Sequence, residues 1–401
     1  MAAIAGGGGT RVIGLISVAH FMSHVFNYCL PPLFPLLKEE FATSYAALGL
    51  AMTGFAVAYG LGQTPAGFLV DRIGARRVLL AGLVVQSAAV ALIAIAESYL
   101  ALLCLFTVAG LAHAVYHPAD YAILSNAVAR DRLGRAFSFH SFTGNVGTAA
   151  VPMIMVFLAA ALSWRAAFAI LGLTGLAVAA LVWLQGSAFA EGTAAERKAR
   201  KAGAQPSLRD SLLLLTSLPI VLCFVFYVVM NMAFGGVRNF AAAALIDMSG
   251  LTLALANAAL TGFLIGISAG TLVGGFIADR WGSRLSTAAI GLLVAGGLNV
   301  LVGSVSLPVV ALIAVLTASG LARGTIQATR DLMVFSMTPE GQHGKVFAFV
   351  STGAAVGAAV TPIIFGWILD LGDPRWVFWI SGIMVIAGIA TFAGVRRAAV
   401  R

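Results

Sequence analysis

The stretch GFLVDRIGARR, residues 67–77, recurs about half a chain later as GFIADRWGSR, residues 275–284. Each copy follows one long apolar run and precedes another, which predicts a short charged hinge between two membrane helices. Duplicated halves with a repeated hinge are typical of alternating-access transporters. The stretch therefore predicts a duplicated helical membrane protein that works by alternating access.

The composition agrees with this interpretation. Of the 401 residues, 60% are hydrophobic and only 10% are charged, whereas a soluble domain carries about 25% charged residues. A membrane-spanning helix needs about 20 predominantly apolar residues. We therefore predict an all-α polytopic membrane protein with twelve transmembrane helices in two pseudo-symmetric six-helix halves. The spans are expected near 12–36, 44–70, 78–97, 99–128, 136–161, 165–186, 212–238, 254–278, 285–304, 307–330, 345–369 and 376–395.

Basic residues are distributed unequally between the two sides of these spans. One side receives most of the Lys and Arg residues, and the other receives only Lys38, Arg165, Arg238 and Arg375. Basic loops stay in the cytoplasm, so both termini and the middle loop are expected there, in a bacterial-type inner (plasma) membrane. The net charge of +9 predicts attraction to anionic membrane lipid and gives no sign of a nucleic-acid partner.

A polar stretch separates the two predicted halves. Residues 1–186 are expected to form the N-terminal six-helix half, 187–210 a cytoplasmic linker and 211–401 the C-terminal six-helix half. The duplication extends beyond the hinges, because GLAH at 110–113 recurs as GLAR at 320–323 with nearly the same spacing. Because separate motifs recur at nearly the same spacing, they support a genuine internal repeat.

The hinges carry a family resemblance. They match the Gly-x-x-x-Asp-Arg-x-Gly-Arg-Arg signature of the major facilitator superfamily, which the chain resembles over essentially its whole length. The first copy has Ala75 where a basic residue is common. Within the superfamily, YHP at 116–118 and the stretch 134–147, from GRAF to GNVG, look most like the fosmidomycin-resistance-type exporters, although the acid here is Asp120 rather than the residue directly after the proline. The resemblance implies rocker-switch transport and proton-coupled export.

The superfamily architecture implies that spans one, four, seven and ten line a central cavity. The sequence supports this independently, since these spans hold most of the polar groups that are unfavourable to bury in a membrane. Helical spacing is expected to place the polar residues of span one on one helix face. It is expected to place those of span four, from His113 to Tyr121, on another face. The candidate substrate-binding residues are Arg323, His113, His24, His20, Asn27, Tyr116, Asn231, Tyr227, Gln327 and Arg238.

Arg323 is the strongest of these candidates. A charge at the bilayer centre costs at least about 2.5–3.5 kcal/mol, and a guanidinium can hold a carboxylate or phosphonate through two parallel hydrogen bonds. Arg323 aligns with His113 in the repeat, so His113 is expected to face the same ligand from the other half. The alternative is that Arg323 forms an internal ion pair that only orders the helices.

The histidines of the first half admit three interpretations. They are proton carriers, substrate donors, or hydrogen-bond partners between helices. The pairs His20/His24 and His113/His117 also have the spacing of metal ligands on one helix face. A metal site is disfavoured by Arg323 in the same cavity, so no metal site and no cofactor are predicted.

Asp120 is predicted to be the only acidic residue well inside a span. A buried carboxyl can exchange a proton with a cavity. Asp120 also aligns with Arg330 in the repeat, near the cytoplasmic ends of spans four and ten, so the two residues could meet when the inner mouth closes. Asp120, His117 and Arg330 are therefore candidates for proton coupling or gating, with a local helix pair as the alternative.

Two further patterns have a mechanical interpretation. Four glycines at every fourth position of span eight, 262 to 274, predict close helix contact, at a sliding interface or in ordinary tight packing. The family resemblance implies that the hinge loops latch the cytoplasmic face through ion pairs and helix dipoles, with a role in setting topology as the alternative. The predicted latch residues are Gly67, Asp71, Arg72, Arg76, Asp279 and Arg280.

These features predict a secondary active transporter that moves a small organic solute, anionic or zwitterionic, by alternating access. The sequence has no Walker A motif, so transport is expected to use a gradient, and the resemblance implies a coupling proton. The alternatives are uptake or exchange of an organic acid and, less favoured, transport of a metal ion. Membrane oxidases with histidine boxes lack duplicated halves, so no enzyme is predicted. A monomer is the expected state.

Overall fold

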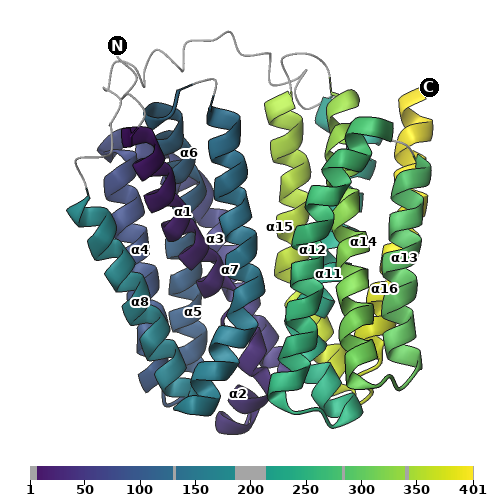
Figure 1. Ribbon diagram of the computed structural model, residues 1–401, viewed down its shortest axis with the longest axis horizontal. Coiled ribbons are helices and arrows are strands. Elements are labelled where there is room, and N and C mark those ends of the chain that lie inside the picture. Colours follow the sequence, from purple (N-terminus) through teal and green to yellow (C-terminus); the bar gives the residue numbers. More distant parts are fainter. Residues whose placement is uncertain (1–6, 130–131, 186–213, 282–284, 339–342, 401) are drawn as a thin grey trace. The chain divides into compact units, whose positions relative to one another are not determined.

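The computed structural model describes residues 7–129, 132–185, 214–281, 285–338 and 343–400 (Figure 1). The predicted linker at 187–210 lies outside these ranges. The first helices, in chain order, are α1 (Gly7–Asn27), η1 (Pro31–Leu33), α2 (Phe34–Glu40), α3 (Tyr45–Ile73), α4 (Ala75–Leu92), η2 (Ile93–Ile95), α5 (Tyr99–His113), α6 (Tyr116–Ala127), α7 (Leu133–Ala161) and α8 (Trp164–Leu184). The remaining helices are α11 (Leu218–Ser249), α12 (Leu253–Trp281), α13 (Leu285–Ser304), α14 (Val309–Ser336), α15 (His343–Asp370) and α16 (Trp376–Val400).

Twelve helical segments among the described residues are long and apolar enough to cross a membrane. The prediction of an all-α protein with twelve spans is therefore confirmed. Spans one, three and four each combine two or three of the helices named above, because short 3-10 or turn segments interrupt them.

The predicted ends of spans seven and ten are wrong. Span seven does not stop at residue 238 but continues to Ser249, because the helix is unbroken until Gly250, whose positive φ of 61° closes it. Span ten does not stop at residue 330 but continues to Ser336. This extension places Asp331 within a span, so the prediction that Asp120 is the only acidic residue there is also wrong.

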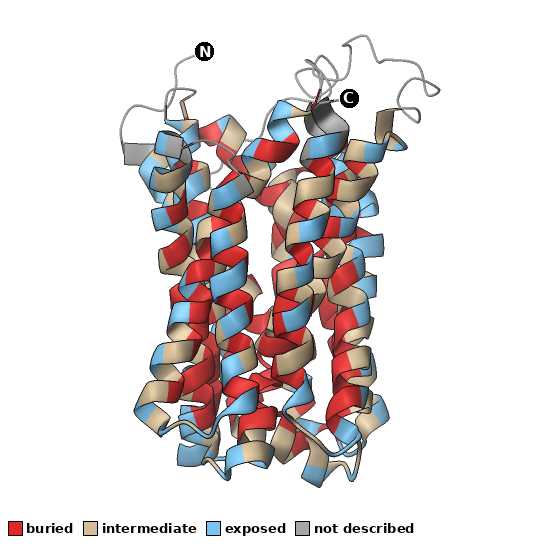
Figure 2. Ribbon diagram, turned by 90° about the vertical axis from the view of Figure 1, so that its right-hand side faces the viewer, coloured by how far each residue is buried: buried red, intermediate tan, exposed pale blue. Residues whose placement is uncertain are grey.

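The helices keep large apolar side chains exposed. Val310, Phe276 and Leu61 are 81%, 75% and 73% exposed, and Figure 2 shows buried and exposed residues sharing the same helical ribbons. A soluble protein rarely leaves so many large apolar groups in water. In a multi-pass membrane protein these groups contact the hydrocarbon chains of the lipid.

The described residues form two compact units. The first unit contains the described residues within the ranges 1–42 and 54–204. The second unit contains the described residues within the ranges 43–53 and 205–401. In the first unit α1 packs on α7 and α4 packs on α8, while in the second α12 packs on α14 and α11 packs on α15 and α16. The predicted boundaries at 186 and 211 remain a prediction.

Close backbone contact joins α12 and α14 within the second unit. A Cβ atom added to Gly270 would overlap the carbonyl group of Leu321, and one added to Gly320 would overlap the carbonyl group of Phe263. Glycines on both helices therefore let the two backbones touch. The predicted close contact of span eight is confirmed, and its partner is the helix that carries Arg323.

An acidic side chain caps a helix in the second unit. Asp370, at the end of α15, accepts hydrogen bonds from the backbone N–H groups of Tyr45 (3.0 Å) and Ala46 (2.8 Å), in the first turn of α3. The first N–H groups of a helix have no partner within it, and a negative charge is favourable at this end. Asp370 therefore stabilises the start of α3.

Replacing Asp370 with alanine is expected to lower the free energy of unfolding by about 1–2 kcal/mol, the usual effect of losing a helix cap. The measurement is thermal unfolding of the purified protein in detergent. Asp373→Ala is the matched control, because the Asp373 carboxylate accepts a local hydrogen bond from the backbone N–H of Arg375. Equal losses for the two variants would contradict the capping role.

Candidate functional site

The predicted site residues form one cluster in each unit. The cluster of the second unit lies on α11 and α14, and its centre is Asp331. The Asp331 Oδ1 atom accepts hydrogen bonds from the Tyr227 hydroxyl (2.8 Å) and from Arg330 Nε (2.9 Å), and it lies 2.9 Å from Arg330 Nη2. The Arg330 guanidinium also stacks 4.3 Å from the centre of the Tyr227 ring. Arg330 is thus neutralised within its own unit.

Arg323 has a different environment. Its guanidinium lies 4.7 Å from the centre of the Phe234 ring, a favourable cation–π contact. Its Nε atom is buried and has no hydrogen-bond partner among the described residues. None of the ion pairs between described side chains includes Arg323, which disfavours the alternative of an internal ion pair.

The other candidates in this unit lie on the same two helices. Asn231 donates a hydrogen bond to the carbonyl oxygen of Tyr227, one turn earlier on α11 (3.3 Å). Gln327, one turn after Arg323 on α14, and Arg238, near the middle of α11, are half-buried. Asp331 was not among the predicted site residues, because span ten was predicted to end at residue 330. The helix extends to Ser336 and therefore includes Asp331.

The cluster of the first unit surrounds Asp120, which is completely buried on α6. The Asp120 Oδ2 atom lies 3.4 Å from Nδ1 of His20, on α1, and 3.6 Å from Nε2 of His140, on α7. The two imidazole rings are stacked, with centres 3.7 Å apart and planes 28° apart. His140 was not among the predicted site residues, because nothing in its local pattern links it to His20. Only the packing of α7 against α1 brings the two rings together.

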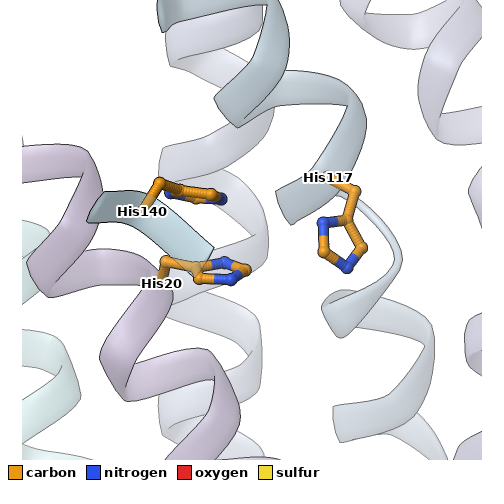
Figure 3. Close-up of side chains that lie close together, drawn as sticks. All are labelled: His20, His117 and His140. Atoms are coloured by element: carbon orange, nitrogen blue, oxygen red, sulfur yellow. The ribbon is translucent and has the colours of Figure 1, made fainter. Parts of the chain in front are cut away.

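His117 completes the group. One ring nitrogen from each of His20, His117 and His140 lies within 4.8 Å of the other two (Figure 3). Six atoms of this cluster are buried without a hydrogen-bond partner among the described residues: Nδ1 of His20, Nδ1 of His117, both ring nitrogens of His140 and both carboxylate oxygens of Asp120. Buried polar atoms are nearly always paired, so these six atoms mark a place where a ligand could bind.

The remaining histidines of the first unit have hydrogen-bond partners outside this group. His24 Nδ1 lies 2.9 Å from the Thr148 hydroxyl. His113 is buried, and its Nδ1 atom lies 3.2 Å from Gln86 Nε2. Tyr116, also buried, packs its ring 5.4 Å from that of His113. The last candidate of this unit, at residue 27, is half-buried at the end of α1.

The helix that carries the predicted face from His113 to Tyr121 is interrupted. Span four is interrupted between the end of α5 at His113 and the start of α6 at Tyr116. Pro118 has no backbone N–H group to donate to the carbonyl oxygen of Ala114. The regular hydrogen-bond ladder is broken there, although Ala114 and Val115 keep helical dihedral angles. The histidine group of the first unit does not include His113.

The fold agrees with a sequence comparison. The sequence model of the Major Facilitator Superfamily matches residues 16–255 and 228–400. The chain belongs to the Major Facilitator Superfamily. It is therefore a multi-pass membrane transporter and a member of a non-enzyme class.

Individual superfamily members show the extent of the similarity. The chain is 25% identical over 295 residues to the fosmidomycin resistance protein of Escherichia coli, covering 71% of this chain and 70% of that one. It is 28% identical over 166 residues to a probable sulfoacetate transporter of Cupriavidus necator, covering 41% and 38% of the two chains. A solved bacterial homologue of the lysosomal transporter Spinster has the same fold, with a TM-score of 0.76 at 14% identity over 99% of this chain and 96% of that one.

The superfamily hinge of the first half has a defined turn. Gly74 separates α3 from α4 with a φ of 99°, a conformation that favours glycine. Arg76 donates a hydrogen bond to the carbonyl oxygen of Trp183, at the end of α8 (2.9 Å).

The other predicted latch residues lie in both hinges. Gly67 is half-buried. The exposed latch residues are Asp71, Arg72 and Arg280. The side chain of Asp279 is not among those that the structure describes. The latch role remains a prediction.

Proposed function

We propose that this transporter moves a small organic anion or zwitterion and that Arg323 is its main anion-binding residue. The observation that carries the proposal is a guanidinium within a span whose buried Nε has no partner among the described residues. A charge in this position is unfavourable without a counter-charge. A carboxylate, sulfonate or phosphonate group supplies both the charge and the missing acceptor.

The neighbouring Arg330 strengthens this assignment. Its charge is already balanced by Asp331, which is half-exposed, whereas the charge of Arg323 is not balanced by an ion pair within the described part of the chain. The Tyr227 hydroxyl holds the same carboxylate. Asp331 therefore keeps one of the two guanidinium groups occupied and leaves the other for a ligand.

The names of relatives point to the same substrate class. They include a fosmidomycin resistance protein, a probable sulfoacetate transporter and a probable L-galactonate transporter. Sulfoacetate and galactonate are organic anions at neutral pH. The shared chemistry supports an acidic organic solute without identifying one.

We extend the proposal to energy coupling and direction. The transporter acts as a proton-coupled exporter in a bacterial-type inner membrane, as a monomer with cytoplasmic termini, and uptake or exchange of an organic acid is the second candidate. The absence of a Walker A motif from the sequence, the similarity to a resistance protein and the one-sided placement of Lys and Arg support this assignment.

The test is transport by the purified protein in liposomes. Sulfoacetate, galactonate and fosmidomycin are loaded separately, and their release is followed with and without a pH gradient of either sign. We expect release of at least one anion that responds to the gradient. Transport of lipophilic cations alone would overturn the substrate class, and anion release that ignores the gradient would overturn proton coupling only.

Replacing Asp331 with asparagine is expected to tighten anion binding about 1.4–5-fold. The substitution frees the charge of Arg330, and a half-exposed ion pair contributes about 0.2–1 kcal/mol. The measurement is the dissociation constant of the transported anion at low salt. Glu40→Gln is the matched control, since Glu40 pairs with Arg165 in the first unit (2.7 Å). Weaker binding by Asp331→Asn would instead make Asp331 part of the binding site.

A further inference from the structure

The cluster of the first unit has the composition of a metal site. Three imidazole groups come from three different helices, His20 from α1, His117 from α6 and His140 from α7, and Figure 3 shows the three rings gathered together. One nitrogen from each lies within 4.8 Å of the others. The Asp120 carboxylate adds an oxygen 3.4 and 3.6 Å from two of these rings.

The unsatisfied atoms favour a positively charged ligand. Each of the four side chains has at least one buried nitrogen or oxygen without a hydrogen-bond partner among the described residues. A buried polar atom that has no hydrogen-bond partner destabilises the fold. One metal cation with four coordination positions can bind one atom from each of the four side chains at once. A single proton can be shared by two of these atoms at most.

The ligand set selects the kind of cation. Neutral imidazole suits zinc, copper, nickel and iron. Protein-bound zinc is held by imidazole nitrogens, thiolates and carboxylate oxygens, with four ligands in structural sites. Magnesium and calcium prefer oxygen ligands throughout. The cluster therefore suits a divalent transition metal and not a hard cation.

Small movements complete the geometry. Zinc ligands at about 2.0–2.1 Å from the ion lie about 3.3 Å from one another, so any nitrogen separation near the 4.8 Å limit of the group must shorten. The rings of His20 and His140 are stacked, so one of them must also turn for both to point at a single ion. Gly144 gives His20 room, because a Cβ atom there would lie 2.9 Å from His20 Nε2.

We propose that the first unit binds one divalent transition-metal ion of the zinc class through His20, His117, His140 and Asp120. The site differs from the pairs that helical spacing suggested, since it excludes His113 and draws on a third helix. It stands apart from the anion-binding proposal, which rests on residues of the second unit.

The experiment is metal binding by the full-length protein in detergent after treatment with a chelator. Zn²⁺ is titrated while bound metal per protein and the melting temperature are measured, and Mg²⁺ is titrated in parallel. We expect about one equivalent of Zn²⁺ and a rise in melting temperature that Mg²⁺ does not produce. Zinc binding well below one equivalent, or equal shifts with both ions, would overturn the proposal.

Variants assign the ligands. His140→Gln and His117→Gln are each expected to weaken Zn²⁺ binding at least tenfold, because even indirect changes at metal sites weaken affinity about 10–100-fold. His117 is only half-buried, so His117→Gln remains informative if His140→Gln does not fold. His113→Gln is the control and should bind Zn²⁺ like the wild type. Undiminished binding by both ligand variants would place the metal elsewhere and contradict the site.

Discussion

Replacing Arg323 with alanine is expected to weaken binding of the transported anion by about 100-fold or more. A hydrogen bond to a charged group contributes about 1.5–3 kcal/mol, and two such bonds to one carboxylate correspond to a factor of about 10² or above. The buried Nε without a partner among the described residues marks the position from which these bonds are made. The measurement is the dissociation constant by thermal shift, followed by transport in liposomes.

The same variant is expected to be at least as stable as the wild type without ligand. Removing a charge from a span relieves a burial penalty of about 2.5–3.5 kcal/mol, whereas loss of the desolvated Phe234 contact costs about 2 kcal/mol. Lost binding together with retained stability separates a ligand-binding arginine from a structural one. A large fall in stability would assign Arg323 to helix packing.

Two further variants sharpen this test. Arg323→Lys keeps the charge but loses the paired geometry of the guanidinium, so intermediate affinity is expected. Arg165→Ala removes an arginine that pairs with Glu40 and should bind the anion normally. Equal anion binding by Arg323→Ala and Arg165→Ala would refute the anion-binding role.

Replacing Gly270 with alanine is expected to destabilise the second unit by about 3 kcal/mol or more. The added methyl group would overlap the backbone of Leu321, and backbone cannot move aside without separating α12 from α14. Overpacking of a tight core costs about 1–3 kcal/mol and occasionally more. The measurements are the yield of monodisperse protein and its thermal unfolding.

Gly275→Ala is the matched control on the same helix. A Cβ atom at Gly275 meets nothing within 4 Å, and alanine favours a helix over glycine by about 1 kcal/mol. This variant should therefore be as stable as the wild type or more stable. A Gly270→Ala protein that unfolds at the wild-type temperature would show that α12 and α14 are not held in backbone contact.

Arg323 lies on the helix that Gly270 contacts. Gly320 and Gly324 lie on either side of Arg323 in sequence, and both meet the backbone of α12. Close contact along this side of α14 limits the rotation of the helix. The same packing therefore determines the direction in which the Arg323 side chain leaves α14.

The sequence by itself determined the fold class and the number of spans, and it singled out Arg323. Apolar runs of about 20 residues predict spans, because a helix needs that length to cross the membrane. A hinge sequence that occurs twice reveals a duplication of the chain. A charge within a span is visible in the sequence alone. Asp331 was not predicted as a site residue, because the end of its helix was predicted a few residues too early.

Only the tertiary structure decided which side chains meet. It brought His20, His117 and His140 together with Asp120, and it joined Asp370 to the start of α3. Helical periodicity records which residues share a face of one helix, but it contains no information on how neighbouring helices are rotated or shifted along their axes. Contacts between helices depend on that rotation and on that shift along the axis, and both are determined only when the helices pack together.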